Sequence, residues 1–94
     1  MSVYFYSSCR PDWRGGRRLV GLVKKGRKEI RLLDLGTFET YKIPAAEERQ
    51  LQPAKTRGTK KLIQDKVRLY KKLGMAYPRA AVKAVLQNLK AGVA

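Results

Sequence analysis

The sequence predicts an α+β fold in which a small antiparallel sheet or partial barrel of about four strands precedes a short helix and a basic helical hairpin. Two observations carry this prediction. Residues 1–43 hold short apolar runs separated by turn residues, whereas residues 59–91 hold apolar residues at helical spacing. A chain of 94 residues has the size of one small domain, so residues 1–94 are expected to form a single unit.

Four segments of the β-rich part have the composition of strands. They are residues 3–6, 19–23, 29–35 and 38–43. The sequence Lys-Lys-Gly-Arg at 24–27 is a short glycine-containing connection, which predicts a hairpin between the second and third strands. In the fourth strand, Phe38, Thr40 and Lys42 are expected to share one face because side chains alternate along a strand.

A short helix is expected over residues 44–52, because Pro44 suits a helix start and Glu47 and Glu48 suit its first turn. Pro53 limits that helix, and residues 53–58 have the composition of a basic connector. The hairpin then occupies residues 59–91.

The ends of the two hairpin helices carry recognisable signals. Thr59 is predicted to be the N-cap of a helix that runs to about Leu73, with Gly74 just past its end. Pro78 is predicted to be the first residue of the last helix, which Gly92 ends.

Both helices are amphipathic. The apolar arc of the first is expected to face the core and consists of Leu62, Ile63, Val67, Leu69, Tyr70 and Leu73. The opposite, polar side is expected to face anions and consists of Lys60, Lys61, Gln64, Arg68, Lys71 and Lys72. Lys66 interrupts this arc and is expected to extend outward into solvent. The apolar stripe of the second helix consists of Val82, Val85, Leu86 and Leu89.

Charge is the strongest functional signal. The net charge is +15, and over residues 55–94 eleven Lys and Arg side chains face one acid, Asp65. This excess predicts a polyanionic partner. The acids Asp12, Glu29, Asp34 and Glu39 are interpreted as turn residues and cross-strand partners of Lys and Arg.

Enzymatic and metal-dependent functions are not predicted. The chain has no histidine and a single cysteine, Cys9, so no zinc site, disulfide framework or nucleophile with a base can be assembled, and no cofactor is expected. No apolar run approaches the about 20 residues that span a bilayer. We therefore expect no membrane partner. A lone thiol suits a reducing compartment, so a cytoplasmic protein is expected, with association with the nucleoid or with a ribonucleoprotein as alternatives.

Residues 59–91 resemble a helix-turn-helix element, in which the second helix enters the major groove of DNA. The resemblance implies that base edges or phosphates are contacted by Arg79, Lys83, Gln87 and Lys90. The alternative is an αα-hairpin that packs its apolar stripes on the sheet and leaves its lysines in solvent.

The strands resemble small SH3-like barrels, which occur in several nucleic-acid-binding proteins. Several cations of this part, including Arg31, lie among aromatic residues, a combination that can bind unpaired bases by stacking. The candidate stacking residues of the chain are Trp13, Tyr41 and Tyr77. The remaining candidate phosphate contacts are Arg14, Arg17, Arg18, Lys24, Lys25, Arg27, Lys28, Lys55, Arg57, Lys60, Lys61, Arg68, Lys71 and Lys72.

Three functions are consistent with these features. The first is a small basic protein that binds DNA or RNA mainly through phosphates. The second is a regulator, inhibitor or adaptor, as mobile elements encode, that docks a basic face on an acidic or nucleic-acid-binding protein. The third is an RNA-binding component of a ribonucleoprotein.

Overall fold

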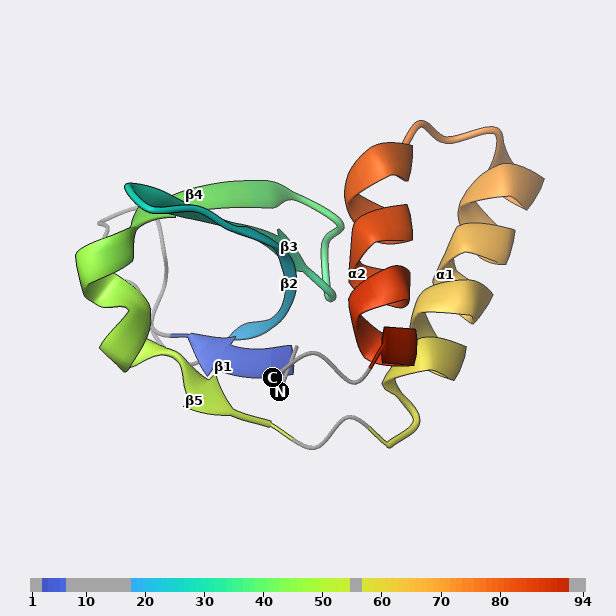
Figure 1. Cartoon of the computed structure of the whole chain (residues 1–94). Coiled ribbons are helices and arrows are strands. Elements are labelled where there is room, and N and C mark those ends of the chain that lie inside the picture. Colours follow the sequence, from blue (N-terminus) through green and yellow to red (C-terminus); the bar gives the residue numbers. More distant parts are fainter. Residues whose placement is uncertain (1–2, 7–17, 55–56, 92–94) are drawn as a thin grey trace.

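Five antiparallel strands form one curled sheet, and two helices lie side by side next to its outer face, with the second helix nearer to the sheet (Figure 1). The structure, a computed structural model, describes residues 3–6, 18–54 and 57–91. The strand order is β4-β3-β2-β1-β5. The strands are β1 (Val3–Tyr6), β2 (Arg18–Lys25), β3 (Glu29–Asp34), β4 (Thr40–Pro44) and β5 (Gln52–Pro53). The predicted α+β fold with a small antiparallel sheet and C-terminal helices is confirmed.

The first three strands match the prediction closely, but the fourth begins later than expected. Asp34 accepts a hydrogen bond on its backbone carbonyl from the Phe38 N–H, at 2.7 Å, so the chain turns at Phe38. Phe38 adopts a left-handed backbone with φ of 62° and is buried. The expectation that it shares a strand face with Thr40 and Lys42 is therefore wrong.

The structure has a fifth strand of two residues in a part of the chain where the sequence predicted no strand. Gln52 and Pro53 pair with Phe5 and Tyr4 of β1. The short helix expected over 44–52 is present as a 3-10 helix, η1 (Ala45–Gln50). Its Glu47 carboxylate accepts a 2.7 Å hydrogen bond from the Tyr6 hydroxyl, which ties this helix to β1.

Alternation along the strands builds a separate apolar cluster on each face of the sheet. The inner cluster, enclosed by the curl, contains Tyr6, Val20, Leu22, Ile30, Leu32 and Ile43. The outer cluster joins the sheet to the helices and contains Val3, Leu33, Leu35, Phe38, Ala54, Ile63, Val82 and Val85. Strands β2 and β3 are therefore covered on both sides.

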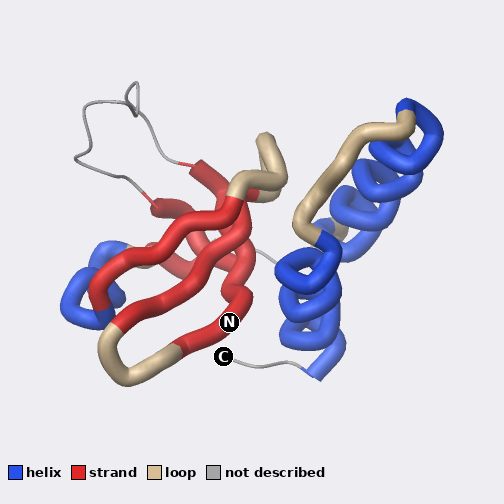
Figure 2. The backbone as a smooth tube through the Cα atoms, turned by 90° about the horizontal axis from the view of Figure 1, so that it is seen from above, coloured by secondary structure: helices blue, strands red, loops and turns tan. Residues whose placement is uncertain are grey.

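Helix α2 (Arg79–Ala91) packs directly on β2 and lies between the sheet and helix α1 (Thr59–Leu73) (Figures 1 and 2). Gly21 makes this close approach possible, because a Cβ atom there would lie 2.6 Å from Cγ1 of Val85. The register of β2 against β3 shifts between Leu22 and Lys24. At this bulge the Leu22 carbonyl accepts a 2.7 Å hydrogen bond from the Asn88 amide of α2.

The predicted helix ends are correct to within a residue, with two corrections. Gly58, in a left-handed conformation, is the N-cap of α1, so Thr59 is its first helical residue rather than its cap. Gly74, with φ of 68°, ends α1 as predicted. Pro78 precedes α2 and accepts the Val82 N–H on its carbonyl, so it is not the first helical residue. Gly92 lies outside the described residues.

The apolar arc of α1 is only partly buried. Ile63 is buried, and Val67 and Tyr70 pack against the outer cluster as predicted. Leu62, Leu69 and Leu73, however, are 48, 51 and 60 % exposed, so their predicted burial is wrong. In α2, by contrast, Val82 and Val85 are buried and Leu86 and Leu89 are partly buried.

The contact between Gly21 and Val85 predicts a specific rescue. Gly21→Ala should lower the free energy of unfolding by about 1–3 kcal/mol, because the new methyl group overlaps Val85. Combining it with Val85→Ala should give a loss smaller than the sum of the single losses, by about 1 kcal/mol or more. Urea unfolding of the single and double variants measures this coupling.

The matched control combines Gly21→Ala with Val82→Ala. Val82 is also a buried valine of α2 but does not approach Gly21. That pair should be additive within about 0.5 kcal/mol. Additive losses in both pairs would contradict the close approach at Gly21.

Candidate nucleic-acid interface

A groove lies between the sheet and the beginning of α2. It is lined by Val23, Arg31, Leu32, Thr40, Tyr41, Lys42, Pro78, Arg79, Ala80 and Ala81. Its volume is about 720 Å³. Arg31 comes from β3, Lys42 from β4 and Arg79 from the first turn of α2. Three cations from three elements therefore border one depression.

A second, smaller groove runs between the two helices. It is lined by Gln64, Val67, Tyr77, Arg79, Val82, Lys83 and Leu86. Arg79 lines both grooves, so the two are contiguous. We call the four cations of these grooves, Arg31, Lys42, Arg79 and Lys83, the cationic track.

No acid is among the described residues that line either groove. Helical spacing places further side chains next to the track on both helices. On α1, Lys60 and Lys71 share a side with Gln64, because they lie four residues before it and seven after it. On α2, Gln87 and Lys90 share a side with Lys83. All four are exposed. The track is thus bordered by further polar and cationic side chains.

The helix starts are unusually basic. Neither α1 nor α2 has an acid in its first turn, and Lys60, Lys61 and Arg79 occupy these positions instead. The helix dipole favours acids there by about 0.3–1 kcal/mol, so each of these cations acts against helix stability. Fold stability alone does not account for their placement.

All six acids in the described part of the chain are engaged by other groups. Asp34 bonds Arg18 at 2.9 Å, Glu48 bonds Lys25, and Glu47 accepts the Tyr6 hydroxyl. Glu39 accepts the Tyr41 hydroxyl at 3.0 Å, while Glu29 and Asp65 lie 3.9 and 3.7 Å from Arg31 and Arg68. The last two contacts are long and exposed, so they neutralise their arginines weakly.

Asp34 has a structural role that its partners define. It is buried, and besides Arg18 its carboxylate accepts the backbone N–H groups of Gly36 and Thr37. This confirms its interpretation as a turn acid and cross-strand partner. The hydrogen bond that Arg18 donates to Asp34 raises the pKa of Arg18, and the hydrogen bond that Lys25 donates to Glu48 raises the pKa of Lys25. Both cations are therefore paired with carboxylates of the same chain and provide less free positive charge.

Lys66 also serves the fold, contrary to the prediction that it extends into solvent. Its ammonium group donates to the backbone carbonyls of Leu35, at 3.3 Å, and Gly36, and it lies 5.3 Å from the centre of the Phe38 ring. These contacts tie α1 to the turn after β3. Tyr70 adds a ring contact to Phe38 at 5.2 Å.

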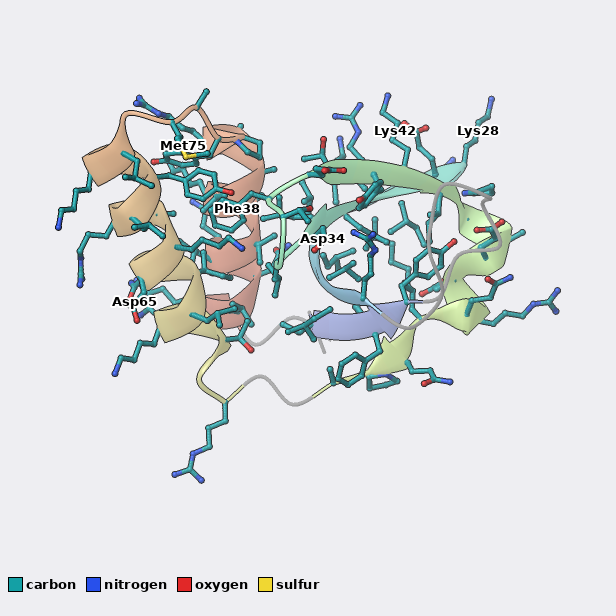
Figure 3. The ribbon with its side chains drawn as sticks, turned by 180° about the vertical axis from the view of Figure 1, so that it is seen from behind. Lys28, Asp34, Phe38, Lys42, Asp65 and Met75 are labelled. Atoms are coloured by element: carbon teal, nitrogen blue, oxygen red, sulfur yellow. The ribbon has the colours of Figure 1, made fainter. Side chains whose placement is uncertain are left out.

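The structure therefore sorts the predicted phosphate contacts into several groups. Arg79 and Lys83 lie in the cationic track, with Lys60, Lys71, Gln87 and Lys90 beside it. Lys24, Arg27 and Lys28 are exposed at the β2–β3 hairpin, and Figure 3 shows Lys28 and Lys42 extending from the same side of the sheet. Lys61, Arg68 and Lys72 lie on the outer face of α1, and Arg57 borders a different groove. Arg14, Arg17 and Lys55 lie outside the described residues.

The predicted stacking residues have unequal surroundings. Tyr41 lines the larger groove. Burial raises the pKa of Tyr41, and its hydrogen bond to Glu39 raises this pKa further. Tyr77 packs edge-on against Tyr70 at 6.1 Å, and the Arg79 guanidinium lies 5.8 Å from its ring centre. Tyr77 is therefore partly committed to the fold. Trp13 lies outside the described residues.

Two residues of the interface were missed as candidates. Lys42 was assigned only to a strand face, although the alternation of β4 places it opposite the buried Ile43. Gln64 was assigned only to the polar side of its helix. A rule that every exposed cation beside a buried strand residue is a candidate contact would have found Lys42.

The two helices run antiparallel and side by side, which is the arrangement of an αα-hairpin (Figure 1). Base readout by α2 stays a prediction. No family model, curated protein or solved structure matches this chain. Neither described helix is long and apolar enough to cross a bilayer, and within the described residues no three Cys, Asp or Glu side chains gather where they could hold a metal ion.

The role of Lys66 predicts that two lysines of α1 differ in their effect on stability. Lys66→Gln should lower the free energy of unfolding by about 1–2 kcal/mol, because it removes charged hydrogen bonds to two backbone carbonyls. Lys72→Gln removes the same charge from an exposed position and should stay within about 0.5 kcal/mol of the wild type. Chemical denaturation measures both, and equal stabilities would show that Lys66 does not fasten α1.

Proposed function

We propose that this protein binds nucleic acid and that it does so mainly through phosphates, along the cationic track. The observation that carries the proposal is the continuity of two acid-free grooves through Arg79. A polyanion laid along them meets cations from β3, β4 and α2, and the carboxylate of Glu29 contacts Arg31 only at 3.9 Å. Cations along such a path can neutralise several phosphates.

The charge distribution supports the same function. Every described acid is held by another group, whereas Lys42, Lys60, Lys71, Lys83 and Lys90 have no ion pair with another described residue. The net charge of +15 makes the folded chain repel itself, and a bound polyanion relieves this repulsion. The cations at the helix starts then gain a role that compensates for their cost to the helices.

The geometry favours backbone contacts over insertion of a helix into a groove of DNA. Helix α2 lies between α1 and the sheet, and its Val82 and Val85 are buried (Figure 2). Only the side bearing Arg79, Lys83, Gln87 and Lys90 is exposed. Phosphates of either DNA or RNA can reach these groups, so the proposal covers both.

A salt titration tests the electrostatic basis of binding. If about five phosphates are neutralised, log affinity plotted against log salt should have a slope of about −4 to −5 on duplex DNA and about −3 to −4 on single strands. Fluorescence anisotropy with labelled mixed-sequence DNA and RNA gives both slopes. An affinity that does not change with salt would refute phosphate-dominated binding.

Two variants with equal charge loss locate the interface. The first replaces the track residues Arg31, Lys42, Arg79 and Lys83 by glutamine, and the second replaces Arg57, Lys61, Arg68 and Lys72. Loss of the track should weaken binding at least tenfold at low salt and reduce the salt slope by about 4. The second variant should keep a slope within about 1 of the wild type.

Because both variants lose four charges, a net-charge effect would weaken them equally. Equal weakening would therefore reject the track as the interface while leaving nucleic-acid binding itself intact. All eight side chains are exposed, so circular dichroism and thermal unfolding should show that both variants fold.

A further inference from the structure

Helix α1 and the turn that follows it carry large apolar side chains that the fold leaves uncovered. Leu62, Leu69, Leu73 and Met75 are 48, 51, 60 and 50 % exposed, and they are the large hydrophobic residues that stand out as exposed in the described chain. The three leucines recur at intervals of seven and four residues, so they share one flank of the helix. We call these four residues the leucine stripe.

The stripe borders a groove on the side of α1 opposite the cationic track. Leu62 and Leu69 line this groove together with Leu19 and Leu35, and its volume is about 680 Å³. Leu62 and Leu19 also line a neighbouring groove with Phe5 and Ala54. The two depressions share these residues and form one apolar channel between α1 and the sheet.

The shape of the channel suits a helix. Leu62 and Leu69 line the channel, and Leu73 continues the stripe one turn further, so the three leucines extend over eleven helical steps, or about 16 Å along the axis of α1. An amphipathic helix binds such a channel through apolar residues spaced three and four apart. A lipid surface instead requires an apolar face that protrudes, whereas Leu62 and Leu69 line a depression.

The charges beside the stripe select an acidic occupant. Lys61, Arg68 and Lys72 follow the adjacent face of α1, and Arg57 borders the channel. The two acids in the channel wall, Asp34 and Asp65, contact Arg18 and Arg68. A second copy of this chain would bring another charge of +15 to the same place, so self-association is opposed by repulsion.

Nucleic acid is also a poor match for this side. The leucine stripe offers aliphatic surface without an aromatic ring on which a base could stack. We propose that the leucine stripe and its channel dock an acidic amphipathic helix of a protein partner. The apolar face of that helix covers the leucines, and its carboxylates face Lys61 and Lys72. This site is separate from the cationic track and does not depend on the proposed function.

The test uses two synthetic, fluorescein-labelled peptides of about 16 residues, long enough to span the stripe as a helix. One peptide has leucine at positions spaced three and four apart and glutamate at most others. The other has the same charge, with alanine in place of each leucine. Fluorescence anisotropy is measured with the wild type, with Leu69→Gln/Leu73→Gln, and with the opposite-flank control Lys60→Gln/Lys71→Gln.

We expect the leucine peptide to bind the wild type saturably, and the alanine peptide to bind at least tenfold more weakly. Leu69→Gln/Leu73→Gln should weaken binding of the leucine peptide at least tenfold, while its affinity for nucleic acid stays within about twofold. The lysine control should keep most of its peptide affinity. Since both leucines are half exposed, thermal unfolding should show that the leucine variant folds.

Several results would overturn the proposal. Equal affinity for both peptides would mean that only charge attracts them, and absence of saturable binding by the leucine peptide would mean that the channel accepts no helix. Phosphatidylserine vesicles that bind the wild type but not the leucine variant, without peptide binding, would assign the stripe to lipid. Sedimentation equilibrium showing a dimer that Leu69→Gln/Leu73→Gln dissociates would assign it to self-association.

Discussion

The close packing of α2 on β2 at Gly21 determines where every surface of this protein lies. A side chain at position 21 would collide with Val85, and the absence of one lets the helix approach the strand backbone. The Asn88 amide then reaches the Leu22 carbonyl at the bulge and fixes the helix along the strand. This placement brings the first turn of α2 close to the sheet, so that Arg79 lines one groove together with Arg31 of β3 and Lys42 of β4.

Local patterns predicted the elements but not their contacts. Strands β1 to β3 follow from apolar runs bounded by turn residues, and α1 follows from its periodicity and Gly74. Strand β5 could not be found in this way, because it consists of two residues, one of them proline, and exists only through pairing with β1. The helical periodicity identified the apolar side of α1. It could not show that Ile63 and Tyr70 pack against the outer cluster while Leu69 and Leu73 stay exposed to solvent.

The candidate interface was even less accessible to sequence patterns. Lys42 and Arg79 lie 37 positions apart in the sequence, and only the packing of α2 on the sheet places them around one groove. Composition predicts a polyanionic partner from the total charge alone, and this stays a prediction. It could not separate cations held by the fold, such as Arg18, Lys25 and Lys66, from those that stay free. That separation depends on which few acids and carbonyls the tertiary structure brings near each lysine or arginine.

Helix α1 stands between two surfaces of different chemistry, and its thickness limits how strongly they influence each other. One flank continues the cationic track through Lys60, Gln64 and Lys71, and the other carries the leucine stripe. A helix with its side chains is about 10–12 Å across, which is close to the Debye length of about 10 Å at 0.1 M salt. Carboxylates docked beside Lys61 and Lys72 would therefore lower the positive potential at the track only partly, and less as salt increases. Because coupling between two binding sites is reciprocal, bound nucleic acid would weaken the binding of an acidic partner by the same factor. This spacing predicts simultaneous binding at physiological salt and a stronger mutual weakening of the two ligands at low salt.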